Sequence, residues 1–125
     1  MNIYDKLNEL VKAIENSNEF LRYKKAAEIV DANETHSQMV KDFIMAQMQI
    51  STAKMLGQQP TEEQIQQFNS LYTTISNISS INEFLQAQMF FSKIMEDVSR
   101  EISKAASLDV EFMKILPDMD GGERE

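Results

Sequence analysis

Residues 39–57 read MVKDFIMAQMQISTAKMLG, and this stretch decides the fold of the chain. Apolar residues recur in it at intervals of four and three, the spacing that places side chains on one face of an α-helix: Met39, Phe43, Ala46, Ile50 and Ala53. A second set of apolar residues lies off that face, namely Ile44, Met45, Met48, Met55 and Leu56. Because a helix that is apolar on more than one face is buried on more than one face, we expect neighbours on two sides of it.

The residues that follow this helix predict a hairpin. Gly57 suits the position just after a helix C-terminus. Thr61 and Gln64 have the spacing of a capping box, which opens a new helix. Because only about three residues separate the two helices, we expect them to pack antiparallel. Neither residues 1–56 nor residues 61–116 contain glycine or proline, which favours helices over strands joined by tight turns.

The same reasoning predicts the helices nearer the N-terminus. The first is expected over about residues 3–15, and Ser17 is the expected N-cap of the second. Asp31 and Glu34 are spaced like an acidic variant of the capping box, and we expect them to open the helix that contains residues 39–57. The N-terminal half therefore reads as three helices separated by short polar breaks.

A long last helix completes the predicted fold. Residues 81–108 keep a four-three apolar repeat typical of helical bundles, with Gln88 as its one polar member. We therefore predict an all-α fold, an oligomeric up-down bundle of about five helices with a long antiparallel helical hairpin. Residues 1–116 are expected to form a single helical domain, and residues 117–125 an acidic, flexible tail.

Composition excludes several classes of function. The chain has 125 residues, a formal net charge of −8 and no cysteine. Without cysteine it cannot form disulfides, thiolate metal sites or its own iron–sulfur cluster. An acidic chain repels phosphate, so direct nucleic-acid binding is disfavoured. The N-terminus does not resemble a signal peptide and no run is long enough to span a membrane, so we expect a cytoplasmic protein that does not bind a membrane.

The sequence has no motif that indicates catalysis. His36 is the only histidine, and it lies near an expected helix start. Phosphate-binding loops, nucleophile elbows and the Glu-x-x-His pairs of di-iron bundles are missing from the sequence. We therefore predict a protein that is not an enzyme, with no catalytic, cofactor-binding or metal-binding residues and no cofactor.

Two similar stretches suggest an interaction surface instead. Residues 43–48 read FIMAQM and residues 84–89 read FLQAQM, and no lysine or arginine occurs in residues 55–91. Charge depletion with methionine and aromatic enrichment is typical of interface cores. We predict self-association through residues on both helices: Phe43, Met45, Ala46, Gln47, Met48, Phe84, Ala87, Gln88, Phe91 and Met95. Two alternatives stay open, that the match is an accident of composition and that many of these side chains fill the core of one chain.

A series of short motifs gives the chain a family resemblance. They are Tyr4-Asp5, Ser17-x-Glu19-Phe20-x-x-Tyr23, Asp31-x-x-Glu34, Phe43-x-x-x-Gln47, Gly57-x-x-Pro60-Thr61-x-Glu63 and Ile81-x-x-Phe84-Leu85-x-Ala87-x-x-x-Phe91. In this order, over residues 3–108, they resemble the bacterial YlbF/YmcA family, including its YheA-like branch. The resemblance implies an all-helical, oligomerising, cytoplasmic protein, and it carries helix-packing roles over to Phe43, Gln47, Phe84, Ala87 and Phe91.

The resemblance also implies a biological setting. YlbF and YmcA act with a third protein, YaaT, in regulating competence, sporulation and biofilm formation. That complex is linked to the messenger-RNA endonuclease RNase Y and binds iron–sulfur clusters through cysteines, which this chain lacks, so the cysteine-free YheA-like branch fits better. We expect a non-catalytic regulatory interaction module whose partners are itself and possible paralogues or an RNase Y-associated complex; the alternative is a structural or chaperone-like helical oligomer.

Overall fold

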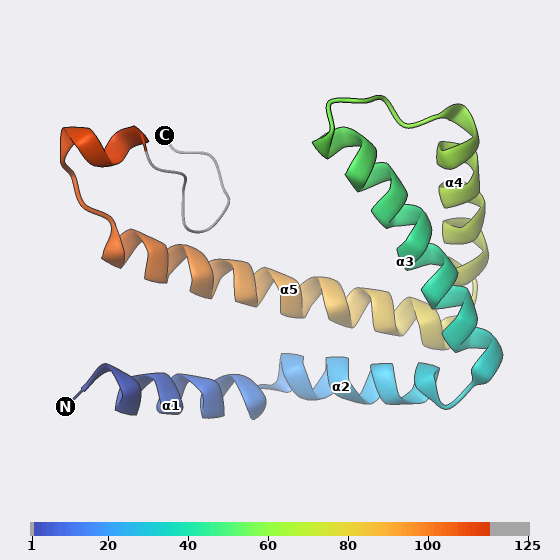
Figure 1. Cartoon of the computed structure of the whole chain (residues 1–125). Helices are drawn as coiled ribbons and strands as arrows, with labels where there is room; N and C mark the ends of the chain where they lie inside the picture. Colours follow the sequence, from blue (N-terminus) through green and yellow to red (C-terminus); the bar gives the residue numbers. More distant parts are fainter. Residues whose placement is uncertain (1, 116–125) are drawn as a thin grey trace. The chain divides into compact units, whose positions relative to one another are not determined.

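The structure, a computed structural model, describes residues 2–115. Over this range all regular secondary structure is helical, which confirms the all-α prediction with five α-helices and a short 3₁₀ helix (Figure 1). The predicted acidic tail, residues 117–125, lies outside the described residues. Contacts divide the chain into two compact units, residues 1–88 and 89–125, which are described separately. The single-domain expectation for residues 1–116 stays a prediction.

The two N-terminal helices each begin at a side-chain cap, and Ser17, the cap of the second, is the predicted one. Helix α1 covers Ile3–Glu15, and the Asn2 side chain accepts a hydrogen bond from the backbone N–H of Asp5 at 2.9 Å. Helix α2 covers Asn18–Asp31, and the Ser17 hydroxyl accepts from the N–H of Phe20 at 3.2 Å. Each cap satisfies one of the N–H groups that a helix start leaves without an intrahelical partner.

Helix α3 covers Glu34–Met55, but its start differs from the prediction. The N-cap is Asn33, whose side chain accepts from the backbone N–H of His36 at 2.9 Å. The predicted capping pair of Asp31 and Glu34 is wrong, because Asp31 is the last residue of α2 and Glu34 is already the first residue of α3. The break between α2 and α3 is therefore only two residues long.

The hairpin of α3 and α4 forms as predicted. Helix α4 covers Glu62–Ser76, and Figure 1 shows it returning beside α3 after the connecting turn. Gly57 ends α3 with a φ of 74°, a left-handed conformation that glycine adopts without a steric penalty. Thr61 and Gln64 form the predicted capping box, with backbone-to-side-chain hydrogen bonds of 2.9 and 3.1 Å. Both ends of the turn are therefore specified by local sequence.

The core of the first unit lies where α3 meets its neighbours. The buried residues that contact one another come from four helices, α2 to α5: Val30, Val40, Phe43, Ile75 and Ile81. The Phe43 ring of α3 lies 5.1 Å from the Phe68 ring and 6.0 Å from the Tyr72 ring of α4, centre to centre. These contacts hold one face of α3 against α4.

Helix α5, Ser79–Ala106, begins in the first unit and continues into the second. Its first turns are joined to α2 by two hydrogen bonds from the Arg22 guanidinium to the Glu83 carboxylate, at 2.7 and 2.8 Å. The Tyr23 and Phe84 rings stack beside this pair, 5.8 Å apart. The second unit contains the rest of α5 and a 3₁₀ helix, Glu111–Ile115. Among the described residues, every helix is too short or too polar to span a membrane.

Candidate interaction surface

The side of α3 that faces away from α4 is apolar and exposed. We call it the outer stripe of α3, and it consists of Ile44, Met45, Met48, Met55 and Leu56, which are 43, 59, 57, 86 and 69% exposed. Successive residues of an α-helix are rotated by about 100°, so Met48 lies roughly 140° around the helix from the buried Phe43. The helix therefore has the two apolar faces expected from its sequence, but only one of them is covered within the chain.

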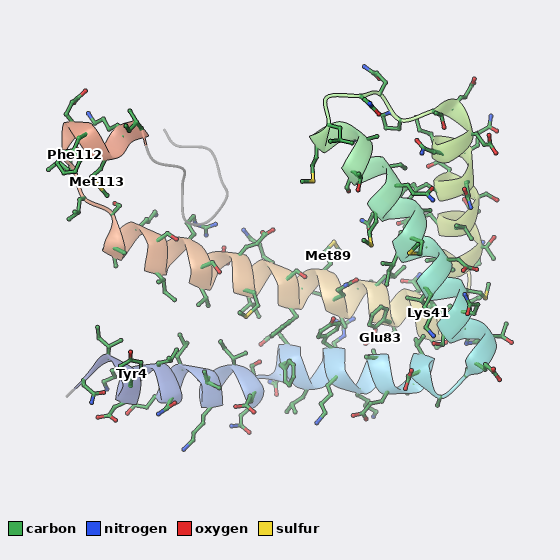
Figure 2. All side chains as sticks on the ribbon, in the orientation of Figure 1. Tyr4, Lys41, Glu83, Met89, Phe112 and Met113 are labelled. Atoms are coloured by element: carbon green, nitrogen blue, oxygen red, sulfur yellow. The ribbon has the colours of Figure 1, made fainter. Side chains whose placement is uncertain are left out.

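The outer stripe is also free of charge. Residues 43–53 contain no acidic or basic side chain, and the polar positions among them are glutamine, serine and threonine. Lys41, labelled in Figure 2, lies one turn before the stripe, and Lys54 lies on the other side of the helix from Met45. Low charge combined with exposed methionine is the composition of an interface core.

A second apolar feature of the same unit is a groove between α2 and α3, with a volume of about 370 Å³. Its apolar lining comes from Ala27, Val30, Val40 and Phe84, and its polar lining from Lys24, Glu28, Asp31, Ser37 and Lys41. The volume falls within the range of pockets that hold small molecules or protruding side chains. The two lysines are balanced by two carboxylates, so the groove shows no preference for either sign of charge.

An ion pair joins α2 to α5 next to the groove residue Phe84. Glu83, labelled in Figure 2, accepts both hydrogen bonds from Arg22, and this pairing holds the pKa of the Glu83 carboxyl below its ordinary value. The same bonds raise the pKa of Arg22. Phe84 follows Glu83 in α5 and lines the groove, and its ring stacks on that of Tyr23.

The first helix presents another apolar face. Four large apolar side chains of α1 are exposed, Ile3, Tyr4, Leu7 and Val11, and α1 has no buried residue. The charged residues of α1, including Asp5, Lys6, Glu9 and Lys12, lie on the other side of this helix. Lys6 and Glu9 form an ion pair at 3.0 Å. Helix α1 is therefore an amphipathic helix with a mixed-charge polar side.

Residues 2–115 hold no group of three or more metal-ligating side chains of the His, Cys, Asp or Glu type. His36 is half-buried near the start of α3, where its Nδ1 lies 3.4 Å from the Ser80 hydroxyl of α5. This contact joins two helix starts and brings no carboxylate to the imidazole among the hydrogen bonds of the described region.

Comparison with known proteins places the chain in a family. A family model described as "Control of competence regulator ComK, YlbF/YmcA" matches residues 3–107. The chain belongs to the YlbF/YmcA family. Relatives named UPF0342 protein include one from Caldicellulosiruptor saccharolyticus, 36% identical over 92% of this chain and 96% of its own length. Another, from Lactobacillus delbrueckii subsp. bulgaricus, is 32% identical over 86% of this chain and 92% of its own.

In this YlbF/YmcA-family chain, the ten residues predicted as an interface fall into three groups. Three are buried within a single copy: Phe43, Ala46 and Ala87. Three are half-buried: Phe84, Phe91 and Met95. Four are exposed: Met45, Gln47, Met48 and Gln88. The buried group packs inside the chain, so the residues of the set that are accessible to another molecule include Met45 and Met48 of α3.

The prediction omitted three residues that complete the exposed face, Ile44, Met55 and Leu56. Their signal was present in the sequence, because Ile44, Met48 and Met55 recur at intervals of four and seven, which is one helix face. The predicted set followed the repeated Phe-x-x-Ala-Gln pattern instead, which mixes the α4-facing side of this family member's α3 with its outer side.

Proposed function

We propose that this chain is a non-catalytic regulatory protein of the YlbF/YmcA family that works by helix-face contacts, with itself and with a protein partner. The observation on which the proposal rests is the outer stripe of α3, five large apolar side chains exposed on a helix whose opposite face is packed. Monomeric proteins rarely expose contiguous apolar surface of this kind unless another molecule covers it.

The magnitude of the apolar exposure supports a protein contact. Fully burying one large apolar side chain contributes roughly 1.5–3 kcal/mol, so covering the stripe contributes on the order of 5–9 kcal/mol given its exposed fractions of 43–86%. Protein association costs roughly 4–15 kcal/mol in lost translational and rotational freedom. One stripe alone is therefore marginal, and two apolar surfaces that cover each other contribute about twice as much, on the order of 10–18 kcal/mol.

The family supports a regulatory role. The model that matches residues 3–107 describes control of a competence regulator, and the resemblance extends this to sporulation, biofilm formation and RNase Y-linked messenger-RNA processing. The chain has no cysteine with which to ligate a cluster in such a complex. Its contribution in this proposal is a binding surface, and paralogues or an RNase Y-associated complex are the partners to test.

The proposal is tested in the native bacterium by replacing the chromosomal copy with an affinity-tagged chain. We expect a defined partner to co-purify, and the purified pair to bind saturably with a single affinity. Deleting the gene is expected to alter competence or biofilm expression, and the tagged chain to restore it. Gln66→Glu is the control variant, because it adds one negative charge at an exposed residue of α4 away from the stripe. It should capture the same partner as the wild-type chain.

Two results count against the proposal. One is an unchanged phenotype on deletion together with no partner enriched over a mock capture. The other is suppression of aggregation of many unrelated unfolded proteins without saturable binding to any, which would instead favour the structural or chaperone-like alternative.

A further inference from the structure

The groove between α2 and α3 has an apolar floor and a charged rim. Its floor residues are buried or half-buried: Ala27, Val30, Val40 and Phe84. Its charged residues are all exposed: Lys24, Glu28, Asp31 and Lys41. A molecule that enters the groove therefore meets apolar surface at the base and charged groups along the edges.

The two signs of charge are separated along the groove. Helix α2 ends at Asp31 and α3 begins at Glu34, so the helices diverge from a two-residue break. Lys24 lies seven positions before the end of α2 and Lys41 seven positions after the start of α3, which places both about 10 Å from the break along their helices. Glu28 and Asp31 lie within about 5 Å of it. The groove is thus acidic near the break and basic at its mouth.

Within residues 2–115, none of these four charged side chains belongs to an ion pair. Lys24 and Glu28 are four positions apart on α2, the spacing at which helix residues of opposite charge commonly pair, yet they do not pair. Charges of both signs are therefore available to a molecule in the groove.

We propose that this groove binds an amphipathic helix of a partner protein. The helix presents large apolar side chains to the floor, an acidic side chain to Lys24 and Lys41, and a basic side chain to Glu28 and Asp31. Because the lysines and Asp31 are about 10 Å apart along the groove, the acid and the base of the partner are about seven helical residues apart, with apolar residues three and four positions from each. The inference rests on the proposed function in taking a protein as the occupant.

The exposure of the rim favours a helix over a small molecule. Pockets for small molecules commonly bury roughly 70–90% of the ligand surface. Every charged group of this groove is exposed, so a small ligand held by these groups stays largely in water. A helix laid over a groove needs only its anchoring side chains to enter, and a volume of about 370 Å³ accommodates them.

The helices of residues 2–115 do not supply the matching pattern, so the occupant is not a second copy. An acid precedes a base by seven positions within α1, α3 and α5. The residues three and four positions after the acid are polar in each case: Asn8 and Glu9, Ser37 and Gln38, and Arg100 and Glu101. In the reverse order, the spacing occurs as Lys24 and Asp31, which belong to the groove itself. The matching helix therefore comes from a different protein.

Peptide binding to the full chain tests the proposal. The probe is a fluorescent helical peptide with the pattern Glu-x-x-Leu-Leu-x-x-Lys, where x is alanine and a hydrocarbon staple on the opposite face holds the helix. We expect saturable binding by fluorescence anisotropy, about 10-fold tighter than for the same peptide with Gln-Gln in place of Leu-Leu. A third peptide, Lys-x-x-Leu-Leu-x-x-Lys, tests the charge preference and should bind the wild-type chain more weakly than the Glu–Lys peptide.

Two double variants of equal net charge separate the groove from general electrostatics. Lys24→Glu with Lys41→Glu makes the groove acidic throughout, whereas Lys25→Glu with Lys54→Glu changes exposed lysines of the same two helices that do not line it. The groove variant should lose about 10-fold in affinity for the Glu–Lys peptide and prefer the Lys–Lys peptide. The control variant should keep the wild-type preference. If a double variant alters the helical circular dichroism, Lys24→Glu and Lys25→Glu alone make the same comparison.

Four outcomes overturn the proposal. The first is no saturable binding of the Glu–Lys peptide, and the second is an equal effect of the two double variants. The third is a fall in oligomeric mass, by light scattering, in the groove variant and not in the control, because the occupant would then be a second copy. The fourth is a small molecule that the purified chain retains in native mass spectra and that the peptide does not displace.

The result is separable from the proposed function. Peptide binding with the expected charge preference, without a regulatory partner in the native bacterium, supports the chemistry of the groove and counts against the regulatory role. A regulatory partner that binds the groove variant as tightly as the wild-type chain does the reverse.

Discussion

Truncation to alanine should affect the free energy of unfolding very differently on the two faces of α3. Phe43 is 7% exposed and its ring contacts Phe68 and Tyr72 of α4, at 5.1 and 6.0 Å between centres. Removing the ring loses its transfer free energy, leaves a cavity and breaks two aromatic contacts. We expect Phe43→Ala to lower the free energy of unfolding by about 3–5 kcal/mol, as for other buried phenylalanines.

Met48, five residues further on, is 57% exposed in a single chain. Under dilute conditions, where chains are separate, Met48→Ala should change the free energy of unfolding by less than about 1 kcal/mol, because little buried surface is lost. Raising the concentration should increase the effect of Met48→Ala but not that of Phe43→Ala, since a partner that binds only the folded chain stabilises it by mass action.

Urea unfolding followed by circular dichroism at several protein concentrations measures both effects. The reasoning fails if Phe43→Ala costs less than 1 kcal/mol, because the ring would then not belong to the core. It also fails if Met48→Ala is as damaging as Phe43→Ala in dilute solution, because the outer stripe would then be packed inside one chain.

Three further predictions concern a turn, a helix cap and an ion pair of the first unit. Gly57→Ala should lower stability by about 1–2 kcal/mol in urea unfolding, because φ is 74° although no atom lies within 4 Å of the added Cβ. Thr61→Ala should cost about 1 kcal/mol by the same assay, because the N–H of Gln64 loses its acceptor. Glu83→Gln should lower the urea midpoint at pH 7 by weakening the bond to Arg22. The pKa of Glu83 is depressed on folding, so its stabilisation is present above its unfolded pKa, near 4.5, and is lost as the pH falls through the lower folded value. The difference between wild type and Glu83→Gln should therefore vanish at acidic pH, and a difference that persists below that window would contradict the assignment.

The turns were predictable because their determinants are local. Gly57, Thr61 and Gln64 act within a few residues of one another, so spacing alone identified the hairpin and its capping box. The start of α3 could not be predicted from local sequence, because Asp31 and Asn33 lie two residues apart and both have side chains that cap helices. The length of α2 decided between them, because α2 extends through Asp31 and leaves Asn33 to cap α3.

The interaction surface was only half predictable. Periodicity showed that α3 is apolar on two faces, yet it does not reveal which face meets α4 and which faces outward. The distinction depends on the apolar residues of α4, whose Phe68 and Tyr72 meet Phe43 and leave Met48 exposed. The bond between Arg22 and Glu83 joins residues 61 positions apart, and no local pattern specifies such a pair.

The exposure of the α3 methionines in solution tests the central claim most directly. Mild peroxide oxidation, read by peptide mass spectrometry, reports the accessibility of Met45, Met48 and Met55 in the unmodified chain. We predict rapid oxidation in dilute solution, where these side chains are 57–86% exposed, and strong protection as concentration rises and a partner copy covers them. Equal oxidation rates at all concentrations would contradict the claim that the outer stripe of α3 is a contact surface.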